Sequence, residues 1–217
     1  MNTIKKIYAT IYLLILIAFT GCNVKVAVKP AAQGKTTMNM ELDLGEVLTR
    51  TLDGAMAGLN EIGGTNGSAP IFDVASIRRS ITTAGFTDVS ITSKERSKLS
   101  LAFTGRMDFV SYTKTKTVLK LSPSMIRKFS SSLGPEFKSV MDLFMAPVVT
   151  GEEMSSSEYK DLVALVYGEK LADDLEASKV EITIASPAGR NKTYTIPLVD
   201  LLTLAEEKEL VAERNAE

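Results

Sequence analysis

Alternation of apolar and polar residues, repeated in neighbouring pairs of segments, is the feature that most constrains how this chain folds. Three pairs alternate in this way across a short turn: residues 23–28 with 36–44, 86–91 with 99–103, and 179–186 with 192–197. A period of two indicates a strand with one buried face, and two such strands around a turn indicate a hairpin. Regular strand–helix–strand units are missing, so we predict an α+β fold with a mainly antiparallel sheet built from hairpins and packed against several helices.

Apolar residues spaced by three and four predict the helices of this fold. Asp73 and Gly85 are placed to begin and end one of them, and Ser155 with Glu158 has the spacing of a capping box before the longest one. The last helix is expected to end in a charged, frayed turn. The predicted helices are 45–59, 74–84, a short one from Pro123, 136–145, 155–175 and 198–214, and a further strand is predicted at 116–121.

The first residues have the pattern of an export signal. Lys5 and Lys6 precede an uncharged, mostly apolar run from Ile7 to Phe19. As a helix this run is about 20 Å long, which is too short for a hydrocarbon core of roughly 30 Å. A positively charged start followed by a short apolar stretch therefore predicts a secretion signal rather than a membrane span.

A bulky apolar residue and two small ones then precede the only cysteine of the chain, in the order Phe19-Thr20-Gly21-Cys22. This tetrapeptide resembles the lipobox of bacterial lipoproteins, in the relaxed form found in spirochaete lipoproteins, with Phe19 where Leu is usual. The resemblance implies a diacylglyceryl thioether on Cys22, cleavage after Gly21 and fatty acids such as palmitate as the membrane anchor. Residues 1–21 would then be the cleaved signal peptide, and residues 22–217 a single extracytoplasmic α+β domain.

The same resemblance gives an expected location. In the enterobacterial sorting rule, Asp after the lipidated cysteine retains a lipoprotein at the inner membrane, and this chain has Asn23 there. We therefore expect a lipid-anchored protein of the cell envelope, at the outer membrane and facing the periplasm or the surface. Two or three acyl chains hold a protein to a bilayer, whereas one holds it only reversibly.

The composition removes most catalytic chemistry. The 217 residues include no His and a single Cys, so Ser–His and Cys–His dyads and thiolate or imidazole metal sites are excluded within the chain. The acidic groups Asp173 and Asp174 face away from the apolar stripe of their predicted helix, which indicates solvation rather than acid–base catalysis. We therefore expect a non-enzymatic protein with no cofactor, no metal and no nucleic-acid partner, and keep a carboxylate-dependent hydrolase as an alternative.

Basic residues are concentrated in the first half of the mature chain. Residues 22–128 hold 15 basic and 9 acidic groups, whereas residues 129–217 hold 8 and 17. Three interpretations are open: solvated turns, a face for anionic lipid headgroups, where each cation contributes about 1 kcal/mol, or docking of the two halves. The candidate residues for binding an anionic surface are Lys94, Arg96, Lys98, Lys114, Lys116 and Lys120.

Methionines suggest one further hypothesis, because flexible sulfur-containing side chains can line an adaptable apolar cavity. The order of Cys22, hairpin, helix and hairpin over residues 22–105 also resembles the LppM-type envelope lipoprotein domain, which implies lipid binding. Two functions remain in view besides the hydrolase: a binding or structural module that contacts another envelope protein, and a carrier of a lipid or other amphiphile. The methionines concerned are Met38, Met40, Met56, Met125, Met141, Met145 and Met154.

Overall fold

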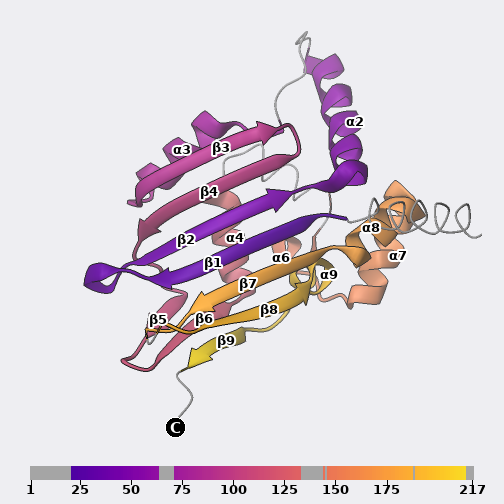
Figure 1. Ribbon diagram of the computed structural model, residues 1–217. Coiled ribbons are helices and arrows are strands. Elements are labelled where there is room, and N and C mark those ends of the chain that lie inside the picture. Colours follow the sequence, from indigo (N-terminus) through magenta and orange to yellow (C-terminus); the bar gives the residue numbers. More distant parts are fainter. Residues whose placement is uncertain (1–20, 64–70, 133–143, 145, 188, 214–217) are drawn as a thin grey trace, which may run out of the picture.

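The fold is α+β, as predicted, and consists of two β-sheets and a set of helices (Figure 1). The computed structural model describes residues 21–63, 71–132, 144, 146–187 and 189–213. The predicted helix at 136–145 lies almost entirely outside the described residues.

Sheet A contains the three predicted hairpins. Its strand order is β3-β4-β2-β1-β7-β8, and every neighbouring pair is antiparallel except β1 and β7, which are parallel. This parallel pair joins the first hairpin to the last one and was not predicted. The strands are β1 (Asn23–Pro30), β2 (Thr36–Asp43), β3 (Thr87–Glu95), β4 (Lys98–Gly105), β7 (Lys179–Ala185) and β8 (Asn191–Pro197).

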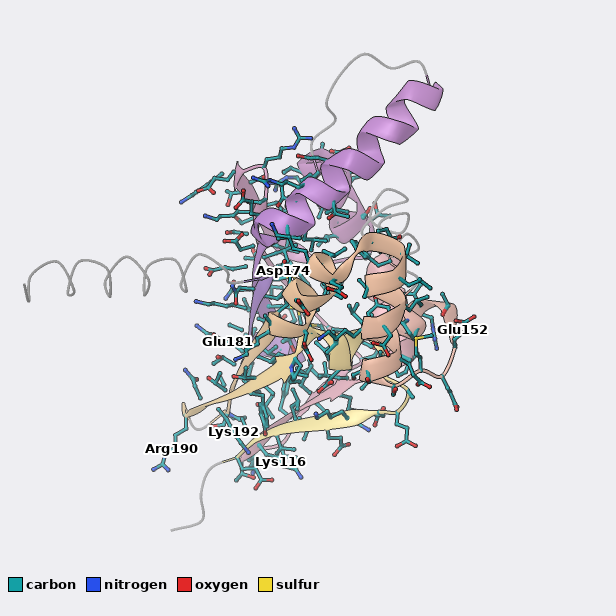
Figure 2. All side chains as sticks on the ribbon, turned by 90° about the vertical axis from the view of Figure 1, so that its right-hand side faces the viewer. Lys116, Glu152, Asp174, Glu181, Arg190 and Lys192 are labelled. Atoms are coloured by element: carbon teal, nitrogen blue, oxygen red, sulfur yellow. The ribbon has the colours of Figure 1, made fainter. Side chains whose placement is uncertain are left out.

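The two faces of sheet A differ as the alternation requires. Across β1, β2 and β4, Val28 faces Met38 and Met38 faces Phe103, and all three side chains are buried. The opposite face is polar, with a Thr37–Thr104 hydroxyl hydrogen bond of 3.1 Å. Figure 2 views the sheet from its side and shows the helices on one side of it. The apolar face is therefore the main core of the domain.

Sheet B is smaller and lies on the helical side of sheet A. It has the order β5-β6-β9, with β5 (Val110–Tyr112), β6 (Lys116–Leu121) and β9 (Lys208–Glu213). Side-chain hydrogen bonds join the two sheets. The Tyr112 hydroxyl donates to the Lys35 carbonyl at 2.5 Å, Thr117 Oγ1 donates to the Ala185 carbonyl at 2.9 Å, and the Tyr194 hydroxyl accepts from the Val211 N–H at 2.9 Å.

Local signals define several helix ends. The Asp73 carboxylate accepts hydrogen bonds from the N–H groups of Ala75 and Ser76, and the capping box of Ser155 and Glu158 is formed. The helices are α2 (Gly45–Gly63), α3 (Val74–Thr83), α4 (Pro123–Ser132), α6 (Pro147–Thr150), α7 (Ser156–Tyr167), α8 (Glu169–Ala177) and α9 (Leu198–Leu202), with a 3-10 turn η1 (Ala32–Gly34).

Two helix predictions were wrong. The segment 155–175 is two helices, because Gly168 has φ 92° and ψ 155° and separates α7 from α8. The predicted helix at 198–214 is only α9, and the charged segment that follows it is strand β9 rather than a frayed helix end. In β9 Leu210 and Ala212 are buried while Glu209 and Glu213 are exposed, so the period there is two.

Candidate functional site

Cys22, the candidate lipidation residue, directly precedes β1 and is buried. Its side chain is 3% exposed, and its carbonyl accepts a hydrogen bond from the Lys179 N–H at 3.3 Å. Burial raises the pKa of the thiol to about 12, and the neighbouring carboxylates of Asp43 and Asp174 act in the same direction. The thiolate is the nucleophilic form of cysteine, so the folded domain holds this sulfur in an unreactive state at neutral pH.

Gly21 packs tightly against the end of α8. A Cβ atom at this position would lie 2.3 Å from the Asp174 carbonyl oxygen and 2.5 Å from Ser178 Oγ. In the uncleaved chain, therefore, a larger residue at position 21 would force a shift of the end of α8, independently of the lipobox. Of the remaining lipobox residues, Phe19 and Thr20 lie outside the described residues.

Asp174 does not have the solvated environment that the sequence predicted. It is half-buried, and its Oδ2 atom is fully buried with no hydrogen-bond partner in the described part of the chain. Burial raises the pKa of this carboxyl group, opposed by the nearby Lys170. Figure 2 shows Asp174 on the helical side of sheet A. Its neighbour Asp173 is exposed, as predicted, and pairs with Lys160 at 3.2 Å.

The structure divides the six candidate cations between opposite ends of the strands of sheet A. Lys94, Arg96 and Lys98 lie in and beside the β3–β4 turn. Lys98 is aligned with Asp43, and Asp43 with Asn23, so this turn is at the Cys22 end. Lys114, Lys116 and Lys120 lie in and before β6, in sheet B. The six residues therefore do not form one basic face.

Four of these cations have acidic partners. Arg96 pairs with Asp53 at 2.8 Å, and Lys98 pairs with Glu95 at 2.9 Å and with Asp43 at 3.8 Å. In the described residues Lys94 and Lys114 have no ion pair, and both are exposed.

The other two paired cations connect the basic half of the sequence with its acidic half. Lys120 lies 2.8 Å from Glu207 and 3.1 Å from Glu209, and Lys116 lies 4.0 Å from Glu213. The three carboxylates belong to β9 or to the segment before it. These contacts agree with the interpretation that the two halves dock on each other, and the Lys120 contacts raise the pKa of its amine.

A groove that no sequence pattern predicted lies at the end of the strands opposite Cys22. The groove has a volume of about 430 Å³ and lies between the start of β3, the β4–β5 connection, the end of β6 and α4. Its lining includes Phe86, Arg106, Asp108 and Met125. These residues come from separate segments, so no single local pattern marks them.

The predicted methionine-lined cavity is only partly visible in the described residues. Met125 lines the groove, whereas Met38 is buried in the core and Met40 and Met154 pack against it. Met141 and Met145, and the side chain of Met56, lie outside the described residues. The described residues also contain no group of three or more Cys, Asp or Glu residues arranged for a metal ion.

Within the described segments, no helix is long and apolar enough to cross a membrane. Comparison with known proteins adds no relative: no family model, no curated protein and no solved structure matches this chain.

Proposed function

We propose that this protein is a lipoprotein of the cell envelope, held to the membrane by acyl chains on Cys22 and acting as a non-enzymatic binding or structural module. One observation carries the proposal: the only cysteine follows a basic and then apolar segment at lipobox spacing, and the first strand of the folded domain begins at the next residue, Asn23. The outer membrane is the proposed location, because Asn23 replaces the Asp that signals inner-membrane retention.

The burial of Cys22 sets the order of events in this proposal. The sulfur must be acylated before the domain folds, while the chain is still emerging at the membrane, because the folded thiol is buried with a pKa of about 12. Cleavage then removes Gly21 from its place beside Asp174 and Ser178.

The anchor would also orient the domain. No linker separates Cys22 from β1, so the Cys22 end of sheet A faces the bilayer. The β3–β4 turn lies at the same end, and its exposed Lys94 has no ion pair in the described residues. A lysine near an anionic bilayer contributes about 1 kcal/mol to binding. The groove lies at the other end and would face away from this membrane.

Metabolic labelling tests the anchor. The full chain and its Cys22→Ala variant are expressed in a lipoprotein-processing bacterium with radioactive palmitate, and the products are weighed by mass spectrometry. We expect label only in the wild-type chain, a mature N-terminus at Cys22, and recovery in the outer-membrane fraction. Equal labelling of both chains, or an unlabelled wild-type chain that keeps residues 1–21, would contradict the proposal.

A further inference from the structure

The distal groove combines an apolar wall with a charged rim. Phe86 packs edge-to-face on Phe103, with ring centroids 4.8 Å apart. Gly105 makes this position possible, because a Cβ atom there would lie 2.3 Å from the Phe86 ring. Phe86, Met107, Phe109 and Met125 supply the apolar lining. Aromatic and methionine side chains of this kind suit a flexible hydrocarbon ligand.

Two groove charges are not used by the fold. Arg106 and Asp108 are exposed on either side of the buried Met107, and neither makes an ion pair or side-chain hydrogen bond within the described residues. The other two charges that line the groove, Lys120 and Glu207, pair with each other at 2.8 Å. The groove therefore offers one cation and one anion, two residues apart, to a ligand.

The groove is far from the proposed anchor. Gly105 is aligned with Thr36 and Thr36 with Pro30, at the opposite end of β1 from Cys22. At about 3.3 Å per residue, the eight residues of β1 separate the two ends by roughly 26 Å. A lipid within the anchoring bilayer would not reach the groove, which favours a ligand that dissolves as a monomer. This step rests on the proposed function, whereas the groove's own chemistry does not.

We propose that the groove binds a single-chain amphiphile with a zwitterionic phosphoethanolamine head. The Arg106 guanidinium donates to the phosphate oxygens, for which its planar fork of donors is suited. The Asp108 carboxylate accepts hydrogen bonds from the ammonium group. The acyl chain lies against Phe86, Met107, Phe109 and Met125. A volume of about 430 Å³ is within the range of pockets that hold one small molecule.

Photo-crosslinking tests this assignment on the full lipidated protein in phosphatidylglycerol nanodiscs. The probe is a short single-chain phosphoethanolamine amphiphile with a diazirine on its chain, and mass spectrometry locates the labelled peptides. We expect labelling of the peptides that contain Met107 and Met125. Arg106→Gln should weaken binding by about tenfold, because it removes a charge-assisted hydrogen bond. Arg190→Gln is the matched control, since Arg190 is exposed and does not line the groove.

Asp108→Asn tests the recognition of the ammonium group. We expect the wild-type protein to bind the phosphoethanolamine probe more tightly than a phosphoglycerol probe with the same chain, and Asp108→Asn to lose this preference. The control Asp161→Asn should keep it, because Asp161 is exposed on α7 and does not line the groove. Arg106 and Asp108 are both exposed, so we expect their variants to fold. Thermal unfolding checks this. Equal labelling by the two probes in wild type, or labels only at the Cys22 end, would overturn the proposal.

The anchor and the groove are tested separately. Absence of palmitate on Cys22 together with groove labelling would end the proposed function and leave the groove assignment standing. Palmitate on Cys22 without groove labelling would support the proposed function and end the groove assignment.

Discussion

The two ends of sheet A differ in how tightly they are packed and in whether their charged side chains are buried or exposed. At the Cys22 end, Gly21 leaves no room for a side chain, and Asp174 has a buried carboxylate oxygen with no hydrogen-bond partner among the described residues. At the groove end, Arg106 and Asp108 are exposed beside an open volume. Close packing favours stability and excludes ligands, whereas unpaired exposed charge beside an apolar wall favours recognition. The proposed anchor therefore requires close packing at one end of the sheet, and the proposed ligand site requires open space and exposed charge at the other.

The largest expected effect is on stability at the Cys22 end. Leu175, in α8, is 4% exposed, and Leu175→Ala should lower the free energy of unfolding by about 2–5 kcal/mol. At roughly 2–4 °C per kcal/mol, the midpoint of thermal unfolding should fall by roughly 4–20 °C. Met125→Ala, in the half-buried groove wall, should cost about 1–2 kcal/mol and reduce crosslinking of the amphiphile. Equal stability losses in the two variants would show that the two ends of the sheet are packed equally tightly.

The hairpins of sheet A could be predicted because their signal is local. Alternation fixes which side chains are buried, and a short turn fixes the partner strand, so the register Val28–Met38 follows from neighbouring residues. The parallel pairing of β1 with β7 joins residues far apart in the sequence. No local pattern specifies it.

Strand β9 shows why the rest of the fold could not be predicted. Leu198, Leu201 and Leu202 continue a helical spacing, and charged residues after them look like a solvated helix end. The segment is a strand instead, because pairing with β6 buries Leu210 and Ala212 and places Glu209 beside Lys120. The groove escapes prediction for the same reason, since its residues meet only after both sheets have formed.

Neutralising one carboxylate at each end, Asp174 or Glu207, should change the midpoint of thermal unfolding by a smaller amount, and in opposite directions. We measure thermal unfolding in the unprocessed Cys22→Ala background, where Gly21 remains in the chain. The Asp174 carboxyl has a raised pKa because it is buried, so its ionised form opposes folding above that pKa. Asp174→Asn should therefore raise the unfolding midpoint at neutral pH, and the gain should shrink as the pH falls through the raised pKa of the wild-type carboxyl, because that carboxyl is then protonated.

Glu207→Gln is the counterpart at the groove end. Glu207 is exposed and pairs with Lys120, so its neutralisation should lower the midpoint slightly, and less so at high salt. A midpoint that falls in Asp174→Asn would mean that the buried carboxylate has a partner, and the contrast between the two ends would be lost.

In the processed chain Gly21→Ala is expected to have no effect on stability, and this substitution distinguishes a cleaved residue from a retained one. Alanine is small enough for a signal-peptide cleavage site, so Gly21→Ala should still yield a mature chain that begins at Cys22 and is chemically identical to wild type. Its unfolding midpoint should then be unchanged. In the Cys22→Ala background residue 21 is retained, and the added Cβ would meet the Asp174 carbonyl oxygen at 2.3 Å. Overpacking of this kind costs about 1–3 kcal/mol, so there the midpoint should fall by several degrees. If Gly21→Ala destabilises both chains alike, residue 21 is part of the folded protein, and its glycine is explained by packing against α8 rather than by processing.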